Sequence, residues 1–316
     1  MRQPDASTPL RIGTRGSPLA LAQAFQTRDW LRAEHGLPVE AFEIVVIKTT
    51  ADRVLDKLLK EIGGKGLFTK ELEEALLDGR IDLAVHCVKD MAVAEPEGLV
   101  SDIFLPREDP RDVLVSHKYR SLAELPQGAS VGTSSMRRGA QTLFVRPDLR
   151  IVNFRGNVQS RLSKLEQGLA DCTFLALAGL NRLGISAQDW TVIGTEEMLP
   201  AIGQGALSVQ RRKGDLWVRD LLMPLHDPVC EREMACERSF LGTLEGSCQT
   251  PIAGLARLSD DVIHFRGEIL RTNGAERISV EGSCPAAEAA ALGARLARDL
   301  LGRAGPGFFD WKRPCG

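Results

Sequence analysis

Hydrophobic positions in the first two thirds of the chain alternate between short apolar runs and helix-like spacings. The apolar runs predict strands at 10–13, 42–48 and 81–88, and the helical spacings predict helices from Ser17 onward and over 70–78. The run at 81–88 is nearly unbroken, which is typical of a central strand covered on both faces. A second set follows, with strands at 113–116, 130–132, 150–154 and 173–178 and helices from Ser135 and over 158–166. This alternation predicts an α/β fold with two α/β domains.

The last third of the chain has a different pattern. Residues 203–209 predict one more strand, followed by a polar stretch at 210–215. A helix at 231–244 and a loop at 245–254 lead to strands at 255–258, 262–270 and 277–282 and then to a helix at 286–301. Consecutive strands followed by a helix predict a small α+β domain at the C-terminal end.

Composition narrows the class of protein. Of 316 residues, 43% are hydrophobic and 26% charged, as in globular proteins, and the length predicts two or three domains. A formal net charge of −2 excludes a global attraction to nucleic acid or membranes. No apolar run reaches the ~18 to 20 residues of a membrane span, and no signal peptide is evident. Seven scattered cysteines without a CxxC pair predict a reducing, cytoplasmic environment.

Three turns expected at helix starts carry cations and hydroxyl groups: Arg15 with Ser17, Lys65 in the run GGKG, and Thr133 to Arg138. A helix N-terminus presents free N–H groups and partial positive charge, which favour anions. The first and last of these turns each follow a predicted strand, so two like domains are expected to face a common cleft. Together, the turns predict an anion-binding cleft.

Further arginines follow predicted strands, at Arg155, Arg161 and Arg182. Of the 40 cationic residues, 30 are arginine, whose planar guanidinium group can donate two hydrogen bonds to one carboxylate. Singly, each of these arginines is compatible with a solvated surface position, and a GC-rich genome also favours arginine. As a set with Arg15, Arg137 and Arg138 they favour a ligand with several carboxylates.

Nucleotide-binding motifs are not supported. Gly64-Lys65 is followed by glycine rather than Ser or Thr, so the run is not a Walker A loop, and Gly203-Gln204-Gly205 lacks the third glycine of a dinucleotide fingerprint. A metal site is not expected either, because His226, Cys230 and Cys236 have no fourth ligand at zinc-like spacing.

Two further positions could carry chemistry. Lys89 and Asp90 end the central strand at 81–88, and ligands of open α/β sheets bind at the carboxyl ends of strands. Asp90 could stabilise a developing cation or orient an N–H group; a structural Lys–Asp ion pair is an equal alternative. Cys248 lies in a loop after a predicted helix, where a thiolate is more accessible than in an apolar run.

These motifs together resemble the porphobilinogen deaminase (hydroxymethylbilane synthase) family. The matching runs occur in family order and cover nearly the whole chain: RIGTRGSPLA at 11–20, GGKGLF at 63–68, KELEEALL at 70–77, AVHCVKD at 84–90, REDPRD at 107–112, VGTSSMRR at 131–138, 149–161 with RGN at 155–157, GQGA at 203–206 and LEGSCQTP at 244–251. Each run alone is a weak indication, but nine in register are specific.

The resemblance implies an enzyme of tetrapyrrole (haem) biosynthesis. Members join four porphobilinogen molecules head to tail into hydroxymethylbilane and release ammonia at each addition. The chain grows on a dipyrromethane cofactor held by a thioether, here expected on Cys248. Each pyrrole carries an acetate and a propionate, which would account for the arginines. By the family pattern, Asp90 would stabilise the cation left when ammonia departs.

The resemblance also implies roles for individual residues. Catalytic roles are expected for Asp90, Lys89 and Arg15. Cofactor-binding residues besides Cys248 would be Ser17, Lys89, Asp90, Thr133, Ser135, Arg137, Arg138, Arg155, Gly156 and Gln204. Substrate-binding residues would be Arg15, Gln23, Lys65, Phe68, Arg155, Arg161 and Arg182.

The implied fold has two α/β domains like those of type II periplasmic binding proteins, flanking a cleft, and a small α+β C-terminal domain. Domain 1 would comprise 1–105 plus 203–223, domain 2 would comprise 110–200, and domain 3 would comprise 228–316 and carry the cofactor cysteine. The expected partner is porphobilinogen, with no nucleic acid or membrane, and the expected state is a monomer.

Some residues depart from the family pattern. Glu61 replaces a common Lys, Cys87 a Ser and Ala92 a Pro, and Ser247 replaces a Gly, which would strain the backbone if that position needs positive φ. None of these changes removes a group that the chemistry needs, so we expect an active enzyme. Two alternatives stay open: a non-catalytic two-lobed binding protein for a polycarboxylate, and, more remotely, a nucleotide-dependent transferase.

Overall fold

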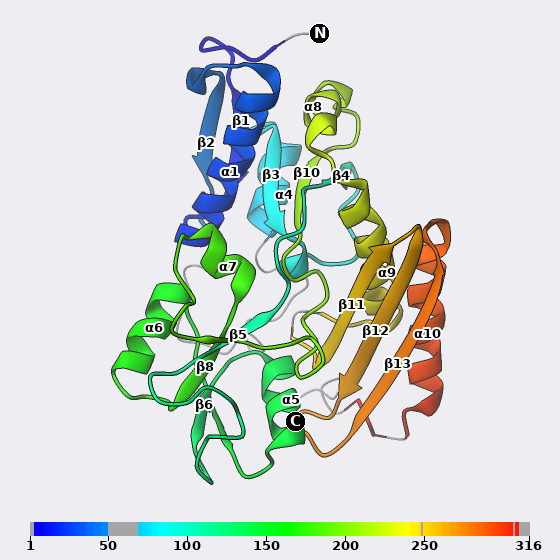
Figure 1. The fold of residues 1–316 in the computed structure, drawn as a ribbon. Coiled ribbons are helices and arrows are strands. Elements are labelled where there is room, and N and C mark those ends of the chain that lie inside the picture. The colour runs from blue at the N-terminus through cyan, green and yellow to red at the C-terminus, as the bar shows by residue number, and fades with distance from the viewer. Residues whose placement is uncertain (1–2, 50–68, 248, 306, 310–316) are drawn as a thin grey trace. The chain divides into compact units, whose positions relative to one another are not determined.

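A computed structural model describes residues 3–49, 69–247, 249–305 and 307–309 of the chain (Figure 1). The described residues form two compact units. The first contains those up to Glu108 together with Ala206–Glu231, and the second contains Asp109–Gly205 and those from Arg232 onward. None of the helices in the described ranges is long and apolar enough to cross a membrane.

A five-stranded mixed sheet with the order β2-β1-β3-β10-β4 forms the frame of the first unit. β1 pairs in parallel with β2 and β3, whereas β10 runs antiparallel to β3 and β4. The strands are β1 (Leu10–Thr14), β2 (Phe42–Val46), β3 (Leu83–Cys87), β4 (Leu99–Phe104) and β10 (Leu207–Arg212). The helices are α1 (Pro18–His35), α4 (Lys70–Leu77) and α8 (Leu216–Leu222). β10, although distant in sequence, therefore lies inside the first sheet.

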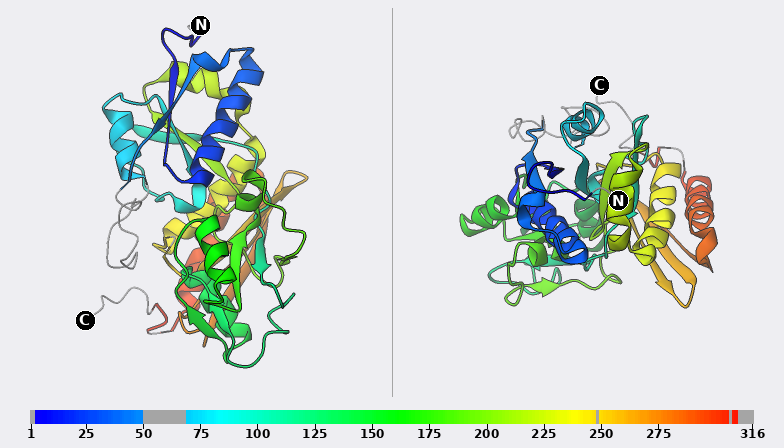
Figure 2. Two further views of the ribbon diagram at one scale, coloured as in Figure 1. Left: turned by 90° about the vertical axis from the view of Figure 1, so that its left-hand side faces the viewer. Right: turned by 90° about the horizontal axis from the view of Figure 1, so that it is seen from above.

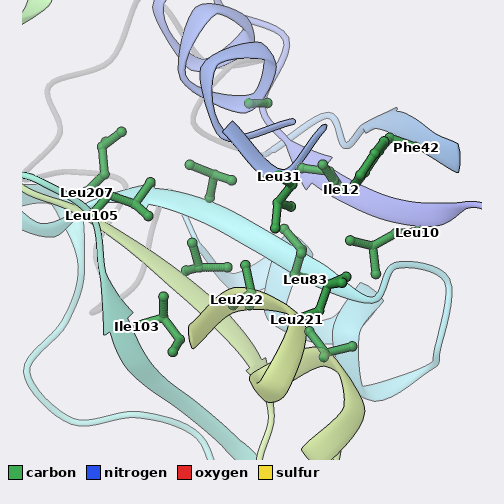
Figure 3. Packing of buried hydrophobic residues seen from close by; sticks show 14 of the residues in the cluster. Leu10, Ile12, Leu31, Phe42, Leu83, Ile103, Leu105, Leu207, Leu221 and Leu222 are labelled. Atoms are coloured by element: carbon green, nitrogen blue, oxygen red, sulfur yellow. The ribbon is translucent and has the colours of Figure 1, made fainter. Parts of the chain in front are cut away.

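Both faces of this sheet are covered. Leu83 and Val85 of β3 belong to a buried cluster with residues of α1 and α8 (Figure 3). Ala84, which points to the opposite face, belongs to a second cluster with Leu72 and Leu76 of α4. The prediction of a central strand buried on both faces is confirmed.

α1 begins as its sequence predicts. The Ser17 side chain accepts a hydrogen bond from the Ala20 N–H, and Pro18 occupies the first helical turn, where its missing N–H has no consequence. The helix ends at Gly36, whose left-handed φ of 64° suits glycine.

The second unit contains a sheet with the order β7-β6-β8-β5-β9. β6 is parallel to β7 and β8, and β5 is antiparallel to β8 and β9, which repeats the pattern of the first sheet. Its strands are β5 (Asp112–Val115), β6 (Ser130–Gly132), β7 (Arg150–Val152), β8 (Cys172–Ala176) and β9 (Thr191–Val192). The accompanying helices are α5 (Met136–Val145), α6 (Val158–Glu166) and α7 (Leu177–Arg182). The prediction of two like α/β sheets is confirmed.

An antiparallel sheet, β11-β12-β13, completes the second unit. It consists of β11 (Ile252–Ser259), β12 (Val262–Leu270) and β13 (Arg277–Pro285), with helix α10 (Ala289–Arg303) and the part of α9 (Pro228–Thr243) from Arg232 onward. α9 and α10 pass side by side (Figure 2). They approach so closely that a Cβ on Gly293 of α10 would lie 2.2 Å from the Cys236 carbonyl oxygen of α9. The predicted α+β character of this part is confirmed.

Several predicted boundaries are wrong. β10 extends to Arg212 where a polar stretch was expected from Gln210, because Gln210 and Arg211 are buried between β3 and β4. β11 begins at Ile252 rather than Leu255. Gly254 therefore lies in this strand and not in the predicted loop. Glycine suits the position, because a Cβ there would lie 2.6 Å from the Ile202 side chain and 2.9 Å from the Phe265 ring.

Candidate functional site

Predicted site residues of the first unit lie at one edge of its sheet. Because β1 and β3 are parallel, with Gly13 opposite Ala84, the segments that follow them leave the sheet at the same edge. Arg15 and Ser17 follow β1, and Lys89 and Asp90 lie on the 3-10 turn Val88–Asp90 directly after β3. Strand pairing thus brings together residues that are far apart in the sequence, at the edge where α/β sheets bind ligands.

Gln23 connects α1 to this edge. Its side chain is only 3% exposed, and its Nε2 donates to Cys87 Sγ at 3.0 Å. Cys87 is the last residue of β3, so this contact fixes the strand end that carries Lys89 and Asp90. The Cys87 departure from the family pattern therefore retains a hydrogen-bond acceptor, although sulfur is a weaker one than a hydroxyl oxygen.

His86 lies on β3, one residue before the strand end at Cys87. It is buried on β3, and burial lowers the pKa of its imidazole from 6.5 to about 4; the positive charge of Arg15 acts in the same direction, and Gln210 opposes it in part. The imidazole is therefore neutral near pH 7, and the cationic charge at this edge remains that of the arginine and lysine side chains.

The second sheet places its predicted residues at the equivalent edge. β6, β7 and β8 are parallel, so their carboxyl ends coincide, and the amino end of β5 joins them because Asp112 lies opposite Ala176. The residues that leave the sheet here are Thr133 and Ser135 after β6, Arg155 and Gly156 after β7, Arg161 in α6 and Arg182 at the end of α7.

The hydroxyl groups of Thr133 and Ser135 shape the turn between β6 and α5. Thr133 Oγ1 accepts from the Ser135 N–H at 3.1 Å. Ser135 Oγ accepts from the Arg138 N–H at 3.4 Å as the N-cap of α5. The prediction that this turn opens a helix after a strand is confirmed, as it is for the turn of Ser17.

Gly156 sits where only glycine fits. Its φ is 123°, and a Cβ there would lie 2.0 Å from Ser160 Oγ. Its carbonyl oxygen accepts from Arg161 Nε at 2.9 Å. On the adjacent residue, Arg155 Nη1 is buried and has no hydrogen-bond partner among the described residues. A buried cationic N–H without an acceptor suits an anionic ligand group.

Arg137 and Arg138 are both paired with one carboxylate of the protein. Arg137 Nη2 donates to Asp112 Oδ2 at 2.8 Å, and Arg138 Nη2 donates to Asp112 Oδ1 at 2.6 Å. The two arginines are 3% and 5% exposed, and Asp112 is 0% exposed. Their predicted part in holding ligand carboxylates stays a prediction.

Gln204 and Arg182 meet at the loop Gly203–Gly205. Gln204 Nε2 donates to the Pro110 carbonyl oxygen at 2.6 Å and to Asp112 Oδ1 at 3.0 Å. Arg182 Nη2 donates to the Gly205 carbonyl oxygen at 2.8 Å. Gly203 and Gly205 both have positive φ, so the loop needs glycine on either side of Gln204.

Three predicted residues, Lys65, Phe68 and Cys248, lie outside the described residues, as does the departure at Glu61. The residues flanking Cys248 form a tight turn: Thr250 Oγ1 donates to the Ser247 carbonyl oxygen at 2.7 Å, and the Ser247 N–H donates to Thr250 Oγ1 at 3.1 Å. Ser247 is not among the described residues with positive φ, so the anticipated strain at this substitution does not arise.

Two family models match this chain. The model described as "Porphobilinogen deaminase, dipyromethane cofactor binding domain" matches residues 10–220, which include both sheet edges. The chain belongs to the porphobilinogen deaminase family. The model described as "Porphobilinogen deaminase, C-terminal domain" matches residues 232–302.

A relative extends the agreement along the chain. The porphobilinogen deaminase of Paracoccus denitrificans is 57% identical over 310 residues, which cover 98% of this chain and 99% of the relative. The activity is that of a hydroxymethylbilane synthase (EC 2.5.1.61) in tetrapyrrole biosynthesis, with a dipyrromethane cofactor. The family membership excludes the two alternative hypotheses, a non-catalytic binding protein and a nucleotide-dependent transferase.

The solved structures to which this chain is similar include periplasmic proteins. A periplasmic substrate-binding protein of an ABC transporter from Coxiella burnetii is 17% identical, with a TM-score of 0.42, and covers 70% of this chain and 94% of its own. A methionine-binding lipoprotein described as putative, from Bacillus subtilis, is 15% identical, with a TM-score of 0.41, and covers 70% of this chain and 91% of its own.

The described residues fit the porphobilinogen deaminase cofactor. Dipyrromethane presents acetate and propionate carboxylates, and Arg155 Nη1 and Arg137 Nε are buried guanidinium nitrogens without an acceptor in the described part of the chain. No group of three or more His, Cys, Asp or Glu in that part is arranged to hold a metal ion.

Asp112 is the site residue that the sequence prediction does not include. It appears there only as the last residue of the run REDPRD. The sequence does contain an indication of its role. Asp112 directly precedes the apolar run Val113–Val115, and an acidic residue at the start of a buried strand needs cationic partners. The register of β5 against β8, which only the structure shows, brings Asp112 to the ligand edge.

Proposed function

We propose that the dipyrromethane cofactor is joined by a thioether to Cys248 and that the predicted site residues of the chain bind its carboxylates and pyrrole N–H groups. The observation that carries this proposal is the parallel strand pairing, which collects Arg15, Ser17, Lys89 and Asp90 at one edge and Thr133, Ser135, Arg155, Arg161 and Arg182 at the other. When bound, the cofactor is the primer to which pyrrole units are added.

Charge complementarity supports the roles of the cationic residues. Each porphobilinogen carries an acetate and a propionate, so a growing product has many carboxylates to neutralise. Arginine is suited to this because its fork meets both carboxylate oxygens. Arg15, Gln23, Lys65, Phe68, Arg155, Arg161 and Arg182 bind substrate in this proposal. Gly156 contributes to cofactor binding, and Arg137, Arg138 and Gln204 contact the cofactor and the substrate pyrroles joined to it.

Asp90 is the proposed catalytic carboxylate. Loss of ammonia leaves a cation on the substrate pyrrole, and a fixed carboxylate at the end of β3 stabilises that charge as it develops. Lys89 precedes it on the same turn and Arg15 follows the neighbouring strand β1, and in this proposal both bind carboxylates of the same ligands. The position of Asp90 on a short turn after a central strand holds the carboxylate in a defined place.

The wider organisation is also part of the proposal. Domain 1 comprises 1–105 plus 203–223, domain 2 comprises 110–200 and domain 3 comprises 228–316; the place of β10 in the first sheet supports the return of the chain to domain 1. We propose that the enzyme is a cytoplasmic monomer that binds porphobilinogen and neither nucleic acid nor membranes.

The test is Asp90→Asn, which keeps the size of the side chain and removes its charge. We expect porphobilinogen consumption to fall by ~100-fold or more, as when one preorganised electrostatic group is removed from an active site. Asp78→Asn, at the exposed C-cap of α4, is the matched control and should keep wild-type activity. Full turnover by Asp90→Asn would exclude the proposed role.

A further inference from the structure

Asp112 holds the donors of three predicted site residues at once. Its Oδ2 accepts from Arg137 Nη2, and its Oδ1 accepts from Arg138 Nη2 and Nε and from Gln204 Nε2. These partners come from two separate segments, α5 and the loop Gly203–Gly205. One buried carboxylate therefore fixes the mutual geometry of these segments at the second sheet edge.

The charge of this cluster explains why a carboxylate is needed here. Arg137 and Arg138 are adjacent buried cations in the first turn of α5, where the helix dipole also disfavours positive charge. Burial by itself would raise the pKa of Asp112, but the two guanidinium groups outweigh that effect and hold the pKa well below its ordinary value. The carboxylate stays ionised and balances one of the two positive charges.

The remaining donors are held rigidly. Arg137 Nη1 donates to Gln141 Oε1 and to the Leu199 carbonyl oxygen, both at 2.9 Å. Arg138 Nη1 donates to the Phe174 carbonyl oxygen at 2.9 Å. Arg137 Nε is buried and without an acceptor among the described residues, so a cationic donor is fixed in place with its hydrogen-bonding capacity unused.

We propose that Asp112 is a positioning residue of the deaminase, which sets the orientation of Arg137, Arg138 and Gln204 for the ligand carboxylates. Asp112 acts through these side chains and does not itself touch the ligand. The inference rests on the proposed function, because it takes from it that these three residues serve the cofactor and substrate.

The experiment compares Asp112→Asn with Asp82→Asn. Asp82 is a close match: its carboxylate also accepts from two arginines, Arg11 at 2.8 Å and Arg212 at 3.3 Å. It directly precedes β3 and therefore lies at the opposite edge of its sheet from Asp90. Steady-state rates with porphobilinogen, intact protein mass and thermal unfolding are measured on the full-length holoenzyme of both variants.

We expect both variants to unfold at lower temperature than the wild type. Only Asp112→Asn should raise the KM for porphobilinogen, by ~10-fold or more with a smaller change in kcat, because it misaligns groups that bind carboxylates in both ground and transition states. A KM within twofold of wild type for Asp112→Asn overturns the proposal. An equal rise of KM in Asp82→Asn also overturns it, because the effect would then follow from general destabilisation.

Asp112→Glu decides the matter if Asp112→Asn does not fold. It keeps the negative charge that balances the arginines but moves the carboxylate by one methylene, so we expect a folded protein with a raised KM. A wild-type KM in this variant shows that charge alone matters and contradicts a positioning role. If the wild-type protein itself neither carries the adduct nor consumes porphobilinogen, the proposed function fails rather than the role of Asp112.

Discussion

At the scale of single residues, the site combines groups whose protonation is set by their surroundings. His86 is buried beside Arg15 and has a pKa of about 4, so it is neutral at neutral pH. Asp112 is buried between two guanidinium groups, and its pKa is held well below its ordinary value. Burial favours the uncharged form of both side chains. Only Asp112 has groups of opposite charge close enough to outweigh this effect of burial on its pKa.

The neutral state of His86 predicts a pH dependence of stability. The folded-state pKa of about 4 lies below the ordinary 6.5, so the unfolded chain binds more protons between these values. The contribution of His86 is complete above pH 6.5 and is lost as the pH falls toward 4. Chemical denaturation at pH 7 and pH 5 should show roughly 2 kcal/mol more loss for the wild type than for His86→Gln. Equal losses would contradict a buried neutral imidazole.

Residue chemistry was predictable from sequence only where the motif itself carried it. Asp90 and Arg15 were predicted as site residues from the runs that contain them, and the strand end that carries Asp90 followed from the apolar run before it. The pairing of Arg137 and Arg138 with Asp112 could not, because it depends on the antiparallel register of β5 with β8. Register between distant segments is a property of the folded chain, and one sequence does not show it.

At the scale of elements, the carboxyl ends of equivalent strands are built in the same way. Gly13 in β1 and Gly132 in β6 each leave room for a large side chain: a Cβ would meet Ile81 at 2.2 Å in the first case and the Phe154 ring at 2.6 Å in the second. Each glycine therefore lets a neighbouring side chain pack against the end of its strand. The turns with Ser17 and Ser135, which the sequence predicts as helix starts, then leave from that edge.

Filling the space at Gly132 should disturb this packing. Gly132→Ala forces Phe154 to move, so we expect a loss of ~1 to 3 kcal/mol in the free energy of unfolding. Gly214→Ala is the control, because nothing lies within 4 Å of a Cβ at that position. Urea denaturation of both variants provides the measurement. Equal stabilities would show that the Phe154 ring adapts and that the close approach is not required.

At the scale of the whole molecule, the sequence pattern predicted two like α/β domains and a small α+β domain, and the two mixed sheets and the antiparallel sheet with its helices agree with that fold class. Periodicity identified the elements with strong apolar runs but did not identify β4, whose run is interrupted by Ser101 and Asp102. The insertion of β10 into the first sheet was expected only through the family resemblance, because a long-range strand pairing leaves no mark in local periodicity.

The proposed attachment of the dipyrromethane cofactor to Cys248 is tested by comparing the intact mass of the denatured wild-type protein with that of a Cys248→Ser variant. We expect the wild type to carry, or to gain after incubation with porphobilinogen, an adduct of two deaminated porphobilinogen units, and the variant to carry none. An adduct that persists in Cys248→Ser, or a wild-type mass that stays unmodified after that incubation, would rule out this attachment.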